Sequence, residues 1–296
     1  MQVNPFYLNN AVGALDTAQA QEQKLTEELS SGVSVNQLSD NPSAAGENVV
    51  LLNQIQQDDT FTQTSSLAEG QLQVTDTTLG SVVSQLNDAI ALVTQGNSGT
   101  ENATDLSSIA GQLTGILNEV QALGNTSYLG NYIFSGSQTA TEPFTMDNST
   151  NPATVIYNGD SNVSTLVTPN GQSIQMNLPG DQIFGSGSTG VLATLSQVIS
   201  SFQAGKADPD GLTAITDSLN YVSQQRVTLD SSLTRLNAAE SAVTGEETQL
   251  KSAQTNLMQA DVGTISTQLS TTESQVAALS SVISQLGKST LFNYLQ

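Results

Sequence analysis

Apolar residues recur at alternating steps of three and four along the last third of the chain, from Leu212 to Leu257. This spacing predicts one long α-helix that carries a narrow apolar stripe along one side. At a rise of about 1.5 Å per residue, such a helix would be roughly 70 Å long. A narrow stripe of that length has to pack lengthwise on partner helices.

Polar residues interrupt the stripe at Arg226, Glu240, Glu247 and Gln254. In one interpretation they set the register of the helices or contact another subunit. In the other, which we favour here, the long Arg and Glu side chains reach past the stripe to solvent.

Further apolar stripes occur in the sequence both before and after this predicted helix. After Leu257 the repeat changes phase and resumes over residues 265–286, which predicts a local change in the helix supercoil. Near the N-terminus a stripe runs over residues 8–29 and breaks at Gly32. Asn41 and Pro42 are typical of a helix cap and a first helical position, respectively. The helix that they start is predicted to stop near Gly96, and a third helix is predicted over 106–123.

The middle of the chain has a different pattern. Pro143, Pro152, Pro169 and Pro179 lie close together there. Apolar and polar residues alternate strictly over 173–178, which is typical of a half-buried β-strand. We therefore expect a β-rich module within an otherwise helical chain.

The predicted fold class is mainly α with an inserted β-rich domain. A long antiparallel helical rod, or coiled coil, would be formed by the N- and C-terminal segments, with both termini at the same end. The expected division is a terminal helical domain (1–40 with 262–296), a helical rod domain (41–134 with 188–261) and a β-rich outer domain (135–187).

Composition narrows the function. The chain has 27 acidic and 6 basic residues, for a net charge of −21, and such a surface repels nucleic acid and anionic membranes. It has no Cys and no His, which removes the thiol nucleophiles, the commonest general base and the commonest zinc ligands. We therefore predict no catalytic site, no cofactor, no metal, no nucleic acid partner and no membrane span. The N-terminus has no secretory signal pattern, so export is expected without a cleaved signal peptide.

Three motifs resemble those of the flagellin superfamily. The first is Leu29-Ser30-Ser31-Gly32 followed by Asp40-Asn41-Pro42, and the second is the segment around Asp261. The third is the chain end, with Leu291, Phe292, Tyr294 and Leu295. This ending, together with 131–139 and 178–184, is more similar to the hook–filament junction branch of the superfamily than to filament flagellin.

The resemblance implies a structural adaptor of the bacterial flagellum, located outside the cell and not an enzyme. The implied partners are other copies of the chain in a ring, flagellin, hook-associated protein 1 and a flagellar export chaperone. Two alternatives are a filament flagellin and, less favoured, a secreted adhesin-like binding protein.

The expected assembly residues lie on the two terminal stripes and the chain end. We expect the stripes to lack partners within the chain, to be largely disordered in the free monomer and to become helical on assembly. The apolar chain end is expected to contact a neighbouring subunit or an export chaperone. The residues are Leu8, Val12, Leu15, Leu25, Leu29, Val276, Leu279, Ile283, Leu286, Leu291, Phe292, Tyr294 and Leu295.

Overall fold

The computed structural model describes residues 5–147, 149–187 and 189–294. The chain divides into two compact units, 1–57 with 246–296 and 58–245. The boundary falls within helices α2 (Pro42–Gly96) and α6 (Pro209–Met258), so each of them contributes residues to both units.

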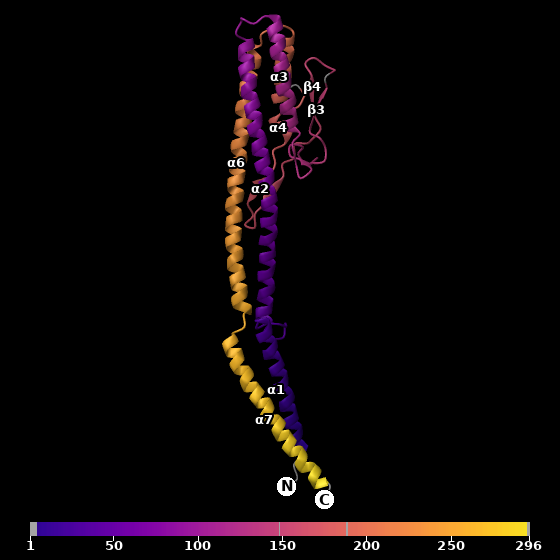
Figure 1. Ribbon diagram of the computed structural model, residues 1–296, viewed down its shortest axis with the longest axis vertical. Helices are drawn as coiled ribbons and strands as arrows, with labels where there is room; N and C mark the ends of the chain where they lie inside the picture. The colour runs from indigo at the N-terminus through magenta and orange to yellow at the C-terminus, as the bar shows by residue number, and fades with distance from the viewer. Residues whose placement is uncertain (1–4, 148, 188, 295–296) are drawn as a thin grey trace. The chain divides into compact units, whose positions relative to one another are not determined.

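The first unit contains the two helices nearest the chain ends, α1 (Pro5–Ser31) and α7 (Val262–Tyr294). They lie side by side and run antiparallel (Figure 1). The breaks between α1 and α2 and between α6 and α7 fall where the stripes were predicted to change. Gly32 ends α1 with a φ of +70°, a left-handed conformation that suits glycine after a helix.

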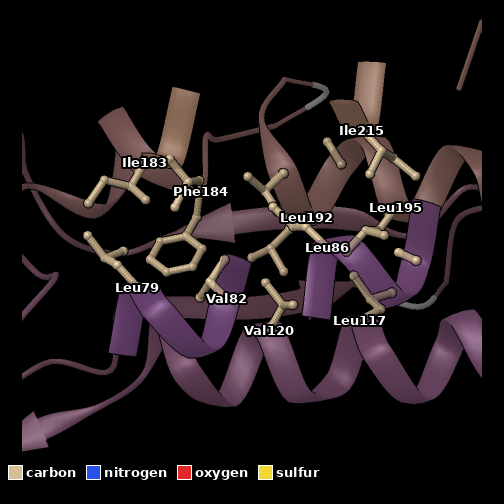
Figure 2. Close-up of a cluster of buried hydrophobic side chains, with 14 of the residues drawn as sticks. Leu79, Val82, Leu86, Leu117, Val120, Ile183, Phe184, Leu192, Leu195 and Ile215 are labelled. Atoms are coloured by element: carbon tan, nitrogen blue, oxygen red, sulfur yellow. The ribbon is translucent and has the colours of Figure 1, made fainter. Parts of the chain in front are cut away.

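The second unit adds α3 (Ala103–Gly124), a short α4 (Gly180–Ile183) and α5 (Val191–Gln203) to its parts of α2 and α6. Asn102 caps α3, because its side-chain oxygen accepts hydrogen bonds from the backbone N–H groups of Thr104 and Asp105. The apolar sides of these helices meet in one core. Figure 2 shows part of it, where Leu79, Val82 and Leu86 of α2 face side chains from α3, α4, α5 and α6.

The β structure consists of three separate two-stranded antiparallel ribbons. The pairs are β1 (Ser127–Tyr128) with β2 (Asn131–Tyr132), β3 (Phe144–Asp147) with β4 (Thr154–Tyr157), and β5 (Thr165–Val167) with β6 (Ser173–Gln175). The predicted strand over 173–178 is therefore too long. It stops at Gln175, and Met176, Asn177 and Leu178 are buried without continuing the ribbon. The predicted class, mainly α-helical with an inserted β-rich part, is confirmed.

Aromatic residues join the β ribbons to the helical core. Phe144 on β3 is fully buried, and its ring centroid lies 5.2 Å from that of Phe184 and 5.1 Å from that of Tyr157. Gly180 makes room for this ring, because a Cβ there would lie 2.8 Å from Phe144 and 2.7 Å from the Phe134 carbonyl oxygen.

Tyr157 should lose its proton at a higher pH than an unperturbed tyrosine does. Burial, reinforced by the nearby Asp181 carboxylate, raises the pKa of Tyr157 to about 12. Because this value exceeds the usual pKa of about 10, its contribution to stability is fully present below about pH 10 and is lost as the pH rises through about 12. We expect a late step in the tyrosinate absorbance that the Tyr157→Phe variant lacks. A late step of unchanged size in the Tyr157→Phe variant would contradict this.

Candidate assembly surfaces

The α1–α7 pair brings together two stripes that lie at opposite ends of the sequence. Leu25 of α1 packs with Ile265 of α7 and with Ala260, and Leu29 and Leu269 flank this cluster. The expectation that the terminal stripes lack partners within the chain is therefore wrong, because each covers the other. Their predicted disorder in the free monomer stays a prediction.

The coverage of these stripes is partial. Among the described side chains of α1 and α7, Ala18, Leu25, Ile265 and Thr272 are buried. Val12, Val262 and Val282 are 39%, 55% and 47% exposed. The other predicted assembly residues that the structure describes are half-buried, namely Leu8, Leu15, Leu29, Val276, Leu279, Ile283 and Leu286.

The predicted chain-end contact lies largely outside the described residues. The backbone of Leu291, Phe292 and Tyr294 continues α7, but their side chains and all of Leu295 fall outside what the structure describes. Their role in assembly remains a prediction.

The first two flagellin-like motifs meet at one joint, where the chain passes between α1 and α2 and again between α6 and α7. Val33 and Gln259 form an antiparallel β-bridge. The Ser34 N–H donates to the Met258 carbonyl over 2.7 Å, and the Ala260 N–H donates to the Gly32 carbonyl over 3.0 Å. These bonds satisfy backbone groups that the two helix breaks would otherwise leave open. We call this arrangement, residues 32–35 with 258–261, the motif joint.

An ion pair orders the loop that leads from the motif joint to α2. Lys24 Nζ lies 3.0 Å from Asp40 Oδ1. The other oxygen of Asp40 accepts from the N–H groups of Asn36 and Gln37 at 3.1 and 2.8 Å. The hydrogen bond with Lys24, followed by that with the Gln37 N–H, lowers the pKa of Asp40 below its usual value.

The remaining motif residues start the next helices. The Asn41 side-chain oxygen accepts from the Ala44 N–H at 3.1 Å, which confirms its predicted capping role at α2. Asp261 does the same for α7, accepting from the N–H groups of Gly263 and Thr264 at 3.0 and 3.2 Å. The Thr264 hydroxyl also donates to Asp261, and this bond is the main cause of the lowered pKa of that carboxyl. Ser30, Ser31 and Pro42 are exposed.

The Leu25→Ala substitution should weaken the first unit selectively. Leu25 is 3% exposed and belongs to a cluster with two other buried residues, Ala260 and Ile265. We expect a loss of about 2 kcal/mol, at the low end for such truncations because the small cluster collapses easily. Denaturant titration followed by helix circular dichroism would measure it, with the exposed Val12→Ala as the matched control. Equal losses in both variants would contradict the assigned packing.

The polar residues of the long stripe mostly contact α2. Arg226 forms a two-pronged ion pair with Asp76, with Nε–Oδ1 and Nη2–Oδ2 distances of 2.8 and 3.0 Å. Gln254 donates to Asn48 at 2.9 Å, and Glu240 accepts from Ser66 at 3.5 Å. The interpretation favoured from the sequence, in which the Arg and Glu side chains reach to solvent, is thus wrong for Arg226, because Asp76 of α2 binds its guanidinium group. Glu247 instead pairs with Lys251 on its own helix.

Sequence reasoning missed the partners that hold the motif joint together. Val33, Ser34 and Met258 lie outside the regular stripes, so the helical repeat does not mark them. The sequence did contain one signal for these partners, namely the short interval between two stripes of different phase. Such an interval indicates a helix break, and a helix break exposes backbone groups that need hydrogen-bond partners.

None of the helices among the described residues combines the length and apolarity needed to cross a bilayer.

Residues 6–139 match the family model described as the bacterial flagellin N-terminal helical region. The flagellar hook-associated protein 3 of Escherichia coli (strain K12) is 26% identical over 262 residues, 80% of each chain. That of Salmonella typhimurium is 29% identical over 182 residues, which is 61% of this chain but only 55% of that protein.

Among solved structures, a putative flagellar hook-associated protein from Vibrio parahaemolyticus shares the fold with a TM-score of 0.65. Its identity is 20%, and the match covers 74% of this chain and all of that one. The resemblance to the flagellin superfamily that the motifs predicted is therefore confirmed.

Proposed function

We propose that this chain is a structural adaptor of the bacterial flagellum that joins the hook-associated proteins to the filament. The observation that carries the proposal is the α1–α7 pair, whose apolar stripes cover each other only in part. A pair of helices with so few buried side chains gains further stability when neighbouring helices cover the rest of its apolar surface. The similarity to hook-associated proteins points to the flagellum as the assembly concerned.

The motif joint supports this role. Its backbone hydrogen bonds join the segment that follows α1 to the segment that precedes α7. The ion pair of Lys24 with Asp40 orders the loop that follows α1. In an assembly, the α1–α7 helix pair would have to contact neighbouring subunits in one fixed orientation. A hydrogen-bonded motif joint next to the pair supports such an orientation.

The proposed partners follow from the role. They are other copies of the chain in a ring, flagellin on one side and hook-associated protein 1 on the other, with an export chaperone before assembly. In this proposal the chain acts outside the cell, is exported without a cleaved signal peptide and catalyses no reaction. The terminal domain, rod domain and outer β-rich domain predicted from the sequence would correspond to the inner, middle and outer parts of the ring.

The main alternative is a filament flagellin, because that family shares the matched N-terminal region. The two functions differ in how far the subunits polymerise. A flagellin should elongate filament seeds indefinitely, whereas a junction subunit should stop after a short layer. Incubation of the purified chain with filament seeds, followed by electron microscopy, separates them.

The test in the source bacterium combines gene deletion with localisation. We expect the deletion strain to be non-motile and to bear hooks without filaments, and antibody labelling of the complemented strain to mark a single band between hook and filament. Label along the whole filament would favour the flagellin alternative, and normal filaments in the deletion strain would overturn the proposal.

A further inference from the structure

Methionine supplies all the sulfur of this chain, which has four Met and no Cys. The methionines differ in their access to solvent. Met176 belongs to the core of the second unit and is 9% exposed, whereas Met146 of β3 and Met258 of α6 are half-buried. Met1 lies outside the described residues. Because a peroxide has to reach the sulfur of a thioether, Met146 and Met258 are the candidates for oxidation within the described part of the chain.

Met258 differs from Met146 in what it borders. It is the last residue of α6, and it lines a surface hollow beside the motif joint together with Gly32 and Val33 of the facing segment. Its backbone carbonyl accepts from both the N–H and the hydroxyl of Ser34, at 2.7 and 3.1 Å. A change at the Met258 side chain therefore acts on the segment whose hydrogen bonds join the two helix breaks.

Another part of the same hollow is polar. Asn48 of α2 and Gln254 of α6 both line it, and Gln254 Nε2 donates to Asn48 Oδ1 over 2.9 Å. A thioether sulfur is a weak acceptor that competes poorly for such an amide hydrogen. Oxidation to the sulfoxide makes the side chain polar and adds an oxygen that accepts hydrogen bonds. The sulfoxide of Met258 would therefore place a competing acceptor beside the amide pair and a polar group beside Val33.

We propose that Met258 is an oxidation site and that its sulfoxide loosens the motif joint. The oxidant is a peroxide, such as hydrogen peroxide from the surroundings. A lone pair of Met258 Sδ attacks one peroxide oxygen and the O–O bond breaks. The released hydroxide takes the proton from the attacked oxygen and leaves as water. The sulfur is thus oxidised by two electrons while the peroxide is reduced. The inference goes beyond the proposed function and does not depend on it.

Peroxide treatment of the purified full-length chain tests whether Met258 is reactive. Peptide mass spectrometry follows sulfoxide formation at each methionine, with the core residue Met176 as the internal control. We expect Met258 to be oxidised about ten times faster than Met176, because a core position reacts only when the structure opens locally. Equal rates at the two positions would overturn the assignment.

Hydrogen exchange tests the effect on the motif joint. The backbone N–H groups of Ser34 and Ala260 both donate across the joint, so their exchange rates report its opening. After oxidation we expect both rates to rise by about tenfold, which matches the cost of a polar group left without good partners. Reduction of the sulfoxide by methionine sulfoxide reductase should restore the original rates.

Two variants separate Met258 from the other thioethers. Met258→Leu keeps the size and apolar character of the side chain but has no sulfur, so peroxide should leave the exchange at its joint unchanged. Met146→Leu removes the half-buried thioether of the second unit, and its joint should respond to peroxide as that of the unaltered chain does. An equal rise in exchange in the Met258→Leu variant overturns the proposal. So does an unchanged rate in the unaltered chain once Met258 is oxidised.

Discussion

Removal of residues 262–296 is expected to abolish filament attachment while leaving the second unit folded. The residues removed include α7, which supplies Ile265 and Leu269 to the small cluster with Leu25 of α1. Among the residues that the structure describes, the core of the second unit shares no buried residue with that cluster. Without α7, the α1 stripe loses its partner, and the surface that we propose for assembly is no longer formed.

Two measurements check this prediction. The truncated chain should keep the cooperative unfolding transition of residues 58–245 in calorimetry, and bacteria that produce it should lack filaments in electron microscopy. Normal filaments would contradict the proposed role of the α1–α7 pair. Loss of the unfolding transition would contradict the independence of the two cores.

A pair of point variants separates packing from the effect of truncation. Ile265 is 6% exposed, so Ile265→Asp places an unpaired carboxylate in the cluster with Leu25 and should prevent the pairing of α1 and α7. The neighbouring Ser266 is exposed, and Ser266→Asp adds the same charge without burying it. We expect filament loss in the first variant and normal filaments in the second.

Replacing Phe144 with Ala should destabilise the second unit by about 3–5 kcal/mol. The side chain is fully buried and contacts the rings of Phe184 and Tyr157. It also fills the space beside Gly124 and Gly180, where no Cβ is present to move into the vacated volume. A large cavity would therefore remain, because the surrounding helices and ribbons can relax only in part.

Chemical denaturation followed by circular dichroism measures this loss. Phe144→Leu retains part of the volume and should lose less, and the exposed Val227→Ala is the matched surface control. If Phe144→Ala lost less than about 0.5 kcal/mol, as surface substitutions do, the aromatic cluster would not hold β3 to the core as described.

Much of the fold could be predicted because its signals are local in sequence. The spacing of apolar residues placed α1, α2, α3, α6 and α7, and Asn41 and Pro42 placed the start of α2. Helical periodicity and capping depend on residues within about one helical turn of each other. Both can therefore be recognised in a single sequence. The strand predicted over 173–178 extends three residues past the end of β6, because so short a strand shows too little alternation to define where it ends.

For the candidate site, the sequence alone determined which residues form the terminal stripes and which motifs flank the helix breaks. Only the tertiary structure decided their partners. It paired Leu25 with Ile265, joined Val33 to Gln259 and turned Arg226 toward Asp76. The physical reason is that periodicity marks the side of a helix that must be covered but does not specify what covers it. That choice depends on contacts between residues more than a hundred positions apart.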